Sequence, residues 1–338
     1  MNSSILISSP YGPESRSGNW RTACRYADLL QRAGVSVRLA VGLGRPRDWQ
    51  DLQAVLVLHA RRSHTVAQHA RARGIALGVV ITGTDLYGDL GPEGAPEHAA
   101  QCAETLGNAV LAITLQQEAH RHLLGLREQR PEWRDLRLIC LPQSSSWAGR
   151  PRVCPASPHD CLMVGHVRPE KDPETGFRGF LKAHLQDPAL GLVHLGASLD
   201  DPLMGRLRLL ADARPQAIQM RGSVGHDEVR AWMDQRGVLI HPSRSEGGAL
   251  VLAEAIARGL WILASDIPGN RGVLGPDFPG FFPAGDANAL AHQLLRLCRD
   301  ETFQRELQAA AAVLLPLLGD PGREQAALLQ ALQPLLRP

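Results

Sequence analysis

Residues 243–254 read SRSEGGALVLAE, a glycine-rich turn that leads into a predicted helix starting near Gly247. Glu246 and Glu254 lie eight positions apart, one at each end of this turn. The free amides and positive dipole end of a helix suit a phosphate, and carboxylates accept hydrogen bonds from hydroxyls. A sugar nucleotide carries both kinds of group. An ordinary strand–turn–helix corner with surface glutamates has the same spacing, so the spacing alone leaves both interpretations open.

The composition favours a two-domain α/β protein. The 338 residues include 44% hydrophobic residues and carry a formal net charge of +2, enough for two cores and without a strongly basic field. With 4% aromatic residues, nucleic-acid binding is not expected. The six cysteines form no CxxC pair and no metal-binding spacing, which predicts reduced thiols and no metal site. The longest apolar stretch, 309–318, contains Pro316, so we expect a cytoplasmic protein without stable membrane insertion.

Short apolar runs alternate with helical segments along the chain. Predicted strands are 5–8, 35–41, 54–58, 77–81, 109–114, 136–141, 161–165, 192–195, 217–220, 238–241 and 261–264. Buried runs of this kind predict doubly wound parallel sheets. The proline- and serine-rich residues 142–158 are typical of a linker. We therefore predict Rossmann-like domains over 1–150 and 151–320, and a final helix in 321–338, hypothesised to cross back onto the first domain.

Ligands of such sheets bind beyond the carboxyl ends of the strands, so the turns after the predicted strands are candidate sites. The first turn brings Arg16, Gly18 and Asn19 to a helix start, where amides and a guanidinium would hold a small anion. It lacks a G-x-G-x-x-G pattern and is equally consistent with a simple tight turn. Directly after another predicted strand come Arg61 and Arg62, whose planar forks suit phosphate.

The next turn, TGTDLY at 82–87, offers hydroxyls and one carboxylate. Thr84 and Asp85 are candidate ligands for the substrate. Asp85 either binds a sugar hydroxyl or orients an arginine, and the residues alone favour neither. His59, at the end of the preceding strand, is either a substrate ligand or a satisfied core histidine.

In the second half, GHVRPEKDP at 165–173 places Arg168 and Lys171 three positions apart beside a predicted helix start. Two cations there would neutralise a diphosphate leaving group without a metal, and no D-x-D motif stands out. SDIPGNRG at 265–272 is expected to line the same site, although loop flexibility alone would also account for its glycines.

The ordered segments GHVRPEKDP, RGSVGHDEV, HPSRSEGGALVLAEAIARG and ASDIPGNRG resemble the landmarks of family-4-type glycosyltransferases. The resemblance implies the α/β GT-B fold, with two Rossmann-like doubly wound parallel-sheet domains facing a cleft. It implies that Glu246 contacts sugar hydroxyls, that Glu254 contacts the ribose, and that Val224 approaches the uracil. The diphosphate would face the amides of three consecutive residues, Gly247, Gly248 and Ala249.

The turn that begins at Gly165 departs from the family pattern in one place. The family commonly has arginine directly after this glycine, whereas here His166 occupies that position and Arg168 follows two residues later. Lys171 matches the family lysine. The resemblance therefore assigns the leaving diphosphate to Lys171 and leaves open whether Arg168 or His166 takes the place of the usual arginine.

A narrower resemblance extends into the first half. SRSGNWRTA, LHARRS, TGTDLY and IPGNRGVLGPDFPGFFP are similar to the selenosugar synthases of selenoneine biosynthesis. This narrower resemblance implies that the enzyme transfers the sugar of a UDP-sugar to the selenium of selenophosphate, without cofactor or metal. The UDP-sugar that it favours is UDP-N-acetylglucosamine. An anionic selenium needs positioning and a positive cradle rather than a general base. Arg16, Asn19, Arg61 and Arg62 are the residues predicted to form this cradle.

Three alternatives to this prediction remain open. In the first, the two adjacent arginines pair with acids of the first domain and stabilise only its fold. In the second, the protein is a general glycosyltransferase that uses a hydroxyl acceptor. In the third, it is a catalytically silent sensor that binds nucleotide sugar without turnover.

Overall fold

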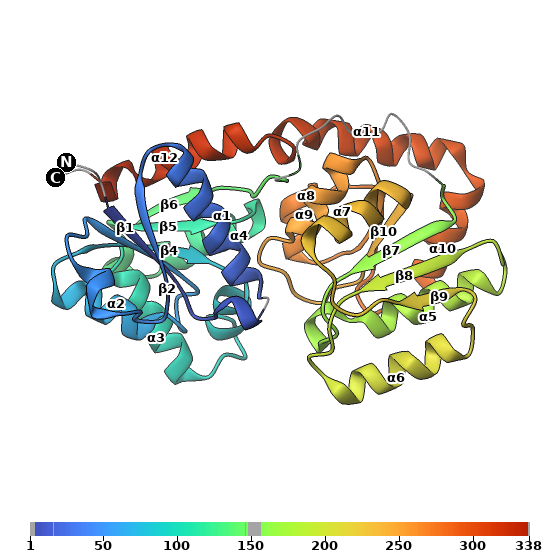
Figure 1. Cartoon of the computed structure of the whole chain (residues 1–338), viewed down its shortest axis with the longest axis horizontal. Helices are drawn as coiled ribbons and strands as arrows, with labels where there is room; N and C mark the ends of the chain where they lie inside the picture. Colours follow the sequence, from blue (N-terminus) through green and yellow to red (C-terminus); the bar gives the residue numbers. More distant parts are fainter. Residues whose placement is uncertain (1–3, 16, 146, 148–156, 337–338) are drawn as a thin grey trace. The chain divides into compact units, whose positions relative to one another are not determined.

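The computed structural model describes residues 4–15, 17–145, 147 and 157–336. They divide into two compact units, one of Met1–Gln143 with Pro321–Pro338 and the other of Ser144–Asp320. Most of the predicted linker, including the expected boundary at 150, falls on residues 146 and 148–156, outside the described part. Each unit contains one six-stranded sheet whose neighbouring strands all run parallel (Figure 1).

The sheet of the first unit has the order β2-β1-β3-β4-β5-β6. Its strands are β1 (Ser4–Ser9), β2 (Ser36–Val41), β3 (Ala54–Leu58), β4 (Ala76–Ile81), β5 (Leu111–Thr114) and β6 (Arg137–Cys140). All five residues of β3 are buried, because helices cover both faces of the sheet. The strand order reverses between β1 and β3, and in sheets of this kind ligands bind beyond the strand ends at such a switch point.

In the described part of this unit, five α-helices surround the sheet: α1 (Gly18–Arg32), α2 (His64–Ala72), α3 (Pro96–Gly107), α4 (Gln117–Glu128) and α12 (Pro321–Leu336). Leu30 of α1 and Leu332 of α12 belong to the same apolar cluster on one face, while Val66 of α2 and Leu106 of α3 belong to the cluster on the other. A buried ion pair between Arg25 and Glu324, 2.5 Å from Nη2 to Oε2, joins α12 to α1. The chain's last helix therefore completes the first unit.

The sheet of the second unit has the order β12-β11-β10-β7-β8-β9. Its strands are β7 (Asp160–Val164), β8 (Gly191–Leu195), β9 (Ile218–Met220), β10 (Val238–His241), β11 (Trp261–Ser265) and β12 (Phe281–Phe282). The eleven strands predicted from the sequence are confirmed, with ends displaced by at most about two residues. Strand β12 was not predicted, because two residues are too few to show a pattern.

Among the residues that the structure describes, seven α-helices flank the second sheet: α5 (Pro173–His184), α6 (Asp201–Asp212), α7 (His226–Gln235), α8 (Leu250–Arg258), α9 (Pro268–Leu274), α10 (Ala287–Arg299) and α11 (Glu301–Leu318). Helix α5 packs against α6 and α10, while α8 packs against α7, α9 and α11, so both faces of the sheet are covered (Figure 1). Within the described residues, every helix is too short or too polar to span a lipid bilayer.

Candidate functional site

Beyond the ends of β7 and β10, the second unit brings a lysine, a glutamate and a histidine together. Lys171 donates from Nζ to Oε1 of Glu246 at 2.6 Å, and His241 Nε2 lies 3.2 Å from the same oxygen. Burial raises the pKa of the Glu246 carboxyl, but the adjacent charge of Lys171 and the contact with His241 outweigh burial and hold this pKa well below its usual range. Glu246 is therefore an ionised carboxylate near neutral pH.

The turn that carries Lys171 is fixed to the turn that carries Glu246 by a second ion pair. Asp172 has a left-handed backbone (φ +41°) and caps α5 by accepting a hydrogen bond from the amide of Thr175. Arg244 donates from Nε to Oδ2 of Asp172 at 2.8 Å, and its own amide donates to the carbonyl of Glu170 at 2.8 Å. Because both contacts join residues far apart in sequence, they set the distance between the lysine and the carboxylate.

The turn at 265–272 packs directly on Glu246. A Cβ atom added to Gly269 would lie 2.3 Å from the carbonyl oxygen of Glu246, so only glycine permits this approach. Asn270 Nδ2 donates to the carbonyl of Ser265 at 2.9 Å, and the Ser265 hydroxyl donates to the carbonyl of Ser243. Close packing against Glu246 therefore requires a glycine at position 269, and loop flexibility alone does not explain it.

The amino end of α8 carries the predicted diphosphate-binding residues. Gly247 and Gly248 precede the helix, and Ala249 is its N-cap residue, without a side chain that accepts a hydrogen bond from the first turn. The helix begins at Leu250, three residues later than predicted. The side chain of the N-cap residue therefore accepts no hydrogen bond from the first amides of α8. A helix start of this kind suits an anionic ligand.

Inside α8, the second glutamate of the motif is bound by a histidine. Glu254 is buried, and its Oε1 accepts a hydrogen bond from His226 Nε2 at 2.7 Å. The imidazole also packs on the ring of Trp147, with centroids 4.8 Å apart. Val224, in the loop before α7, packs half-buried against the core of the unit. Sequence reasoning missed His226 because a single histidine at a helix start carries no pattern.

The residues that follow β7 have different environments. His166 Nδ1 accepts a hydrogen bond from the amide of Ala197 at 3.0 Å, which ties the imidazole to the neighbouring turn. A Cβ atom at Gly196 would lie 1.9 Å from the Gly165 carbonyl, so the two turns touch at their backbones. Arg168 is 43% exposed, and its Nε lies 4.0 Å from Glu170 Oε2. Lys171 therefore reaches Glu246, whereas the ion pair of Arg168 lies within its own turn.

A buried histidine that the sequence did not single out supports this turn. His194 in β8 donates from Nε2 to the carbonyl of Gly165 at 3.1 Å. Burial, and to a smaller extent the neighbouring His166, lower its pKa to about 4 despite this hydrogen bond. His194 is therefore a neutral donor at physiological pH and holds the end of β7 in place.

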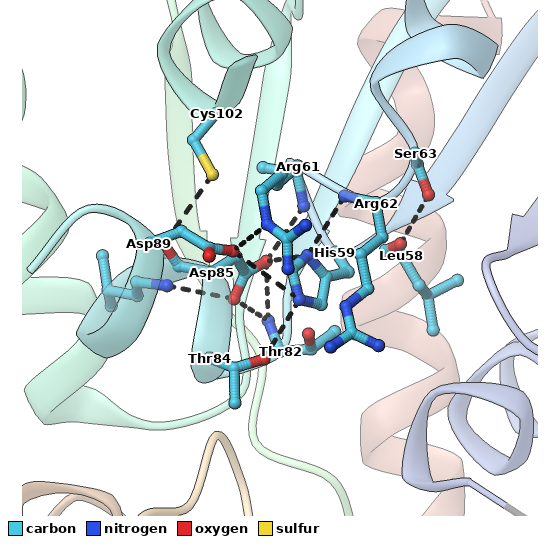
Figure 2. A network of polar contacts seen from close by, with 12 residues as sticks. Leu58, His59, Arg61, Arg62, Ser63, Thr82, Thr84, Asp85, Asp89 and Cys102 are labelled. Atoms are coloured by element: carbon cyan, nitrogen blue, oxygen red, sulfur yellow. Dashed lines mark hydrogen bonds and ion pairs between the residues drawn. The ribbon is translucent and has the colours of Figure 1, made fainter. Parts of the chain in front are cut away.

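In the first unit, Asp85 makes structural contacts that the sequence did not indicate (Figure 2). Its side chain is wholly buried in η3, the π-helical turn Thr84–Asp89. Its two oxygens accept hydrogen bonds from the amides of Ala60 (3.0 Å), Thr82 (3.0 Å), Gly83 (2.9 Å) and Leu86 (3.1 Å). A carboxylate used in this way is not available to a sugar hydroxyl and does not orient an arginine. Asp85 instead joins the turn after β3 to the turn after β4.

His59 is also a structural residue (Figure 2). It is 1% exposed, has a left-handed backbone (φ +69°), and its Nε2 lies 3.0 Å from Oγ1 of Thr84. Its Nδ1 accepts a weak hydrogen bond from the amide of Arg62 at 3.4 Å. The histidine therefore fits the satisfied-core alternative, and Thr84 serves as its partner. The substrate contact of His59 stays a prediction that its burial does not favour, and that of the exposed Thr84 stays a prediction.

The two adjacent arginines differ in their partners. Arg61 pairs through Nε with Oδ2 of Asp89 at 2.8 Å, with the carboxylate mostly buried. Arg62 lies over the ring of Tyr11, with 5.0 Å between its guanidinium carbon and the ring centroid. The alternative in which an arginine pairs with an acid of its own domain thus holds for Arg61. Arg62 makes a cation–π contact between the turn after β1 and the turn after β3.

At the start of α1, Ser17 is the N-cap and accepts a hydrogen bond from the amide of Trp20 at 3.2 Å. Gly18 and Asn19 are the first two residues of this helix. Arg16 lies outside the described residues. The helix start is therefore already capped by a side chain, in contrast to that of α8.

One group of side chains in the described part has the donors and spacing to hold a metal ion. It consists of His159, Asp187 and Cys298, whose ligand atoms all lie within 4.8 Å of one another. His159 precedes β7 and Asp187 precedes β8, so the group lies at the strand ends opposite to Gly165. Sequence spacing could not have indicated it, because its members are far apart in the chain.

Residues 154–313 match the family described as glycosyl transferases group 1. A curated relative is the phosphatidylinositol N-acetylglucosaminyltransferase gpi3 subunit of Schizosaccharomyces pombe, 32% identical over 99 residues. That match covers 27% of this chain and 22% of the relative, so the chain matches less than a quarter of the relative's length.

Solved structures resemble the whole chain. Sucrose-phosphate synthase from Thermosynechococcus elongatus has a TM-score of 0.78 at 16% identity, covering 99% of each chain. Anabaena HepE, solved with UDP and glucose, has a TM-score of 0.74 at 13% identity, covering 98% of this chain and 100% of that one. The pneumococcal O-GlcNAc transferase GtfA, solved with UDP and GlcNAc, has a TM-score of 0.66 at 15% identity, covering 85% and 58%. At these identities the likeness shows the fold, which is the predicted GT-B fold.

Proposed function

We propose that this protein is a glycosyltransferase that uses a UDP-sugar donor, since residues 154–313 match the family of group 1 glycosyl transferases. The observation that carries the proposal is the ion pair of Lys171 with the ionised Glu246, beside a helix start whose N-cap residue offers no side-chain cap. Relatives of the same fold were solved with UDP and a sugar, which supports this choice of donor.

In this proposal, Lys171 stabilises the diphosphate as it leaves. An ammonium has three donors, so the lysine keeps its hydrogen bond to Glu246 while donating to a phosphate oxygen. The first amides of α8 and the helix dipole add positive potential at the same place. Because protein cations and amides supply this stabilisation, the proposed reaction requires no metal ion. Glu246 accepts hydrogen bonds from the sugar, and Glu254 accepts them from the ribose.

We further propose selenophosphate as the acceptor and UDP-N-acetylglucosamine as the donor, on the strength of the sequence resemblance. The selenium attacks C1, the bond from C1 to the diphosphate oxygen breaks, and UDP leaves. Water then cleaves the selenium–phosphorus bond and releases phosphate. A selenium anion needs no general base, which fits the assignment of His59 and Asp85 to structural roles.

The acceptor's oxyanion is assigned to Arg62 in this proposal. The charge of Arg61 is already matched by Asp89, whereas Arg62 lies over Tyr11 at the switch point between β1 and β3. A guanidinium held over an aromatic ring retains its N–H donors around the rim for phosphate oxygens.

A hydroxyl acceptor is the second candidate, and one observation favours it. The pairing of Arg61 with Asp89 neutralises one of the three arginines of the predicted positive cradle. A general glycosyltransferase would then use the same donor site with a different acceptor.

The test is a mass-spectrometric assay of the purified protein with UDP-N-acetylglucosamine, with and without selenophosphate. We expect UDP and a selenium-containing sugar only when selenophosphate is present. UDP release with an added hydroxyl acceptor, but not with selenophosphate, would support the second candidate. Binding of UDP-sugar without turnover under either condition would contradict both.

A further inference from the structure

His226 is the hydrogen-bond partner of Glu254 in the second unit, and it belongs to a different helix. Its Nε2 lies 2.7 Å from Glu254 Oε1, a short distance typical of a charge-assisted hydrogen bond. The carboxylate is 3% exposed at its side chain, whereas the imidazole is 38% exposed. The histidine therefore connects a buried carboxylate on α8 to the surface at the start of α7.

The imidazole is itself held in place on one face. Trp147 packs on it with ring centroids 4.8 Å apart and planes 35° from parallel, and this indole is 6% exposed. Since Nε2 donates to the carboxylate, the tautomer and the ring plane are both set by neighbours. A glutamate whose Oε1 is bound by a fixed donor has one orientation, and that orientation also fixes the position of Oε2.

A vicinal diol is the ligand that such a carboxylate suits. Both hydroxyls can donate to carboxylate oxygens, but only if the carboxylate is ionised and correctly rotated. A glutamate without a partner would lose rotational freedom on binding, and a glutamate already held by His226 has lost it beforehand. Preorganisation of this kind increases affinity without any direct contact between the histidine and the ligand.

We propose that His226 is a positioning residue, which holds Glu254 so that the carboxylate accepts hydrogen bonds from the ribose diol and discriminates against a 2′-deoxyribose. This inference rests on the proposed function and adds to it the residue that sets the preference for a ribonucleotide. Trp147 supports the histidine through packing alone.

The opposite interpretation makes a prediction of opposite sign. If His226 merely occupied the carboxylate in place of the ribose, it would have to be displaced by the nucleotide. Its removal would then strengthen UDP binding. If His226 positions the carboxylate, its removal weakens UDP binding and leaves the affinity for 2′-deoxy-UDP almost unchanged.

The experiment measures the affinities of UDP and 2′-deoxy-UDP by calorimetry for the full-length wild type, His226→Ala and His226→Gln. For the wild type we expect UDP to bind about tenfold more tightly than 2′-deoxy-UDP, the size of a hydrogen bond to a charged group. In His226→Ala this ratio should fall to about one through loss of UDP affinity alone. His226→Gln retains an N–H donor and should recover part of the ratio.

Two further variants separate positioning from stability. Trp147→Phe keeps a ring against the imidazole and should retain the ratio between the two nucleotides. His292→Ala removes an exposed histidine from α10 of the same unit and should change neither affinity. In steady-state assays, His226→Ala should raise KM for the donor and leave kcat nearly unchanged, a division that a general loss of folded protein would not produce.

The possible failures are distinguishable. If UDP does not bind the wild type, the proposed function is wrong, and the inference is wrong with it. If UDP binds the wild type and the His226→Ala ratio stays near its wild-type value, or UDP binding becomes tighter, the positioning role alone is wrong.

Discussion

Both units place a carboxylate beside a histidine and a basic residue after parallel strands, yet the two carboxylates have different partners. In the second unit, Glu246 is bound by the side chain of Lys171. In the first unit, Asp85 is bound by backbone amides and is wholly buried. A side-chain cation can rearrange to share its donors with a ligand, whereas backbone amides in a fixed turn cannot. The partner therefore distinguishes a candidate ligand-binding carboxylate from a structural one.

The largest expected effect concerns the structural carboxylate. Asp85→Ala leaves several buried amides without acceptors, and we expect the free energy of unfolding to fall by about 4 kcal/mol. Urea denaturation of the full chain measures this. Asp28→Ala, which removes an exposed carboxylate from α1 of the same unit, is the matched control and should cost less than about 0.5 kcal/mol. A stable Asp85→Ala protein with impaired catalysis would instead restore a substrate role for Asp85.

The next largest effect concerns the lysine of the second unit. Lys171→Ala should lower kcat for UDP release by about 10²- to 10³-fold, the usual loss when one donor to a developing negative charge is removed. Lys182→Ala, at an exposed position of α5, is the control and should retain full activity. Circular dichroism should be unchanged in both. Full activity of Lys171→Ala would remove the proposed leaving-group role.

A smaller effect separates the two arginines of the first unit. Arg62→Ala should raise KM for the anionic acceptor about tenfold, through loss of one charge-assisted contact. Arg61→Ala should change this KM less and instead lower the thermal midpoint, because it leaves the mostly buried Asp89 without its partner. Initial rates over a range of acceptor concentrations, with thermal unfolding of both variants, measure the difference. The reverse pattern would assign acceptor binding to Arg61.

The smallest effect is a pH dependence of stability. The ordinary pKa of Glu246 is 4.5, and its folded pKa is depressed, so it contributes stability above pH 4.5 that is lost as pH falls toward the folded pKa. Lys171→Ala removes the strongest lowering influence. We therefore expect the stability difference between wild type and variant to shrink as pH falls below 4.5, as measured by urea denaturation at each pH. A constant difference across this range would contradict the assigned cause.

Much of the fold could be predicted because its information is local. A buried parallel strand such as β3 (AVLVL) is a continuous apolar run and needs no partner to be recognised. Strand β12 was not predicted, because Phe281–Phe282 is too short to show an apolar run. The start of α8 was misplaced by three residues, since two glycines permit either a turn or a helix start.

The candidate site was only partly predictable, for a physical reason. The family resemblance assigned Lys171 and Glu246 to the same donor, but it did not predict the direct hydrogen bond between these residues, which are 75 positions apart. His226 and His241 were not predicted as site residues, because each acts through a tertiary contact with a glutamate. The amide partners of Asp85 could not be predicted, because the direction of backbone amides cannot be read from residue types.

We propose that the second unit binds the donor through Lys171, the start of α8 and Glu254. A crystal structure of the protein with UDP tests it most directly. We expect a diphosphate within hydrogen-bond distance of Lys171 Nζ and of the amides at Gly248 and Ala249, with the ribose hydroxyls on Glu254. UDP bound away from these residues would show that the donor site is elsewhere.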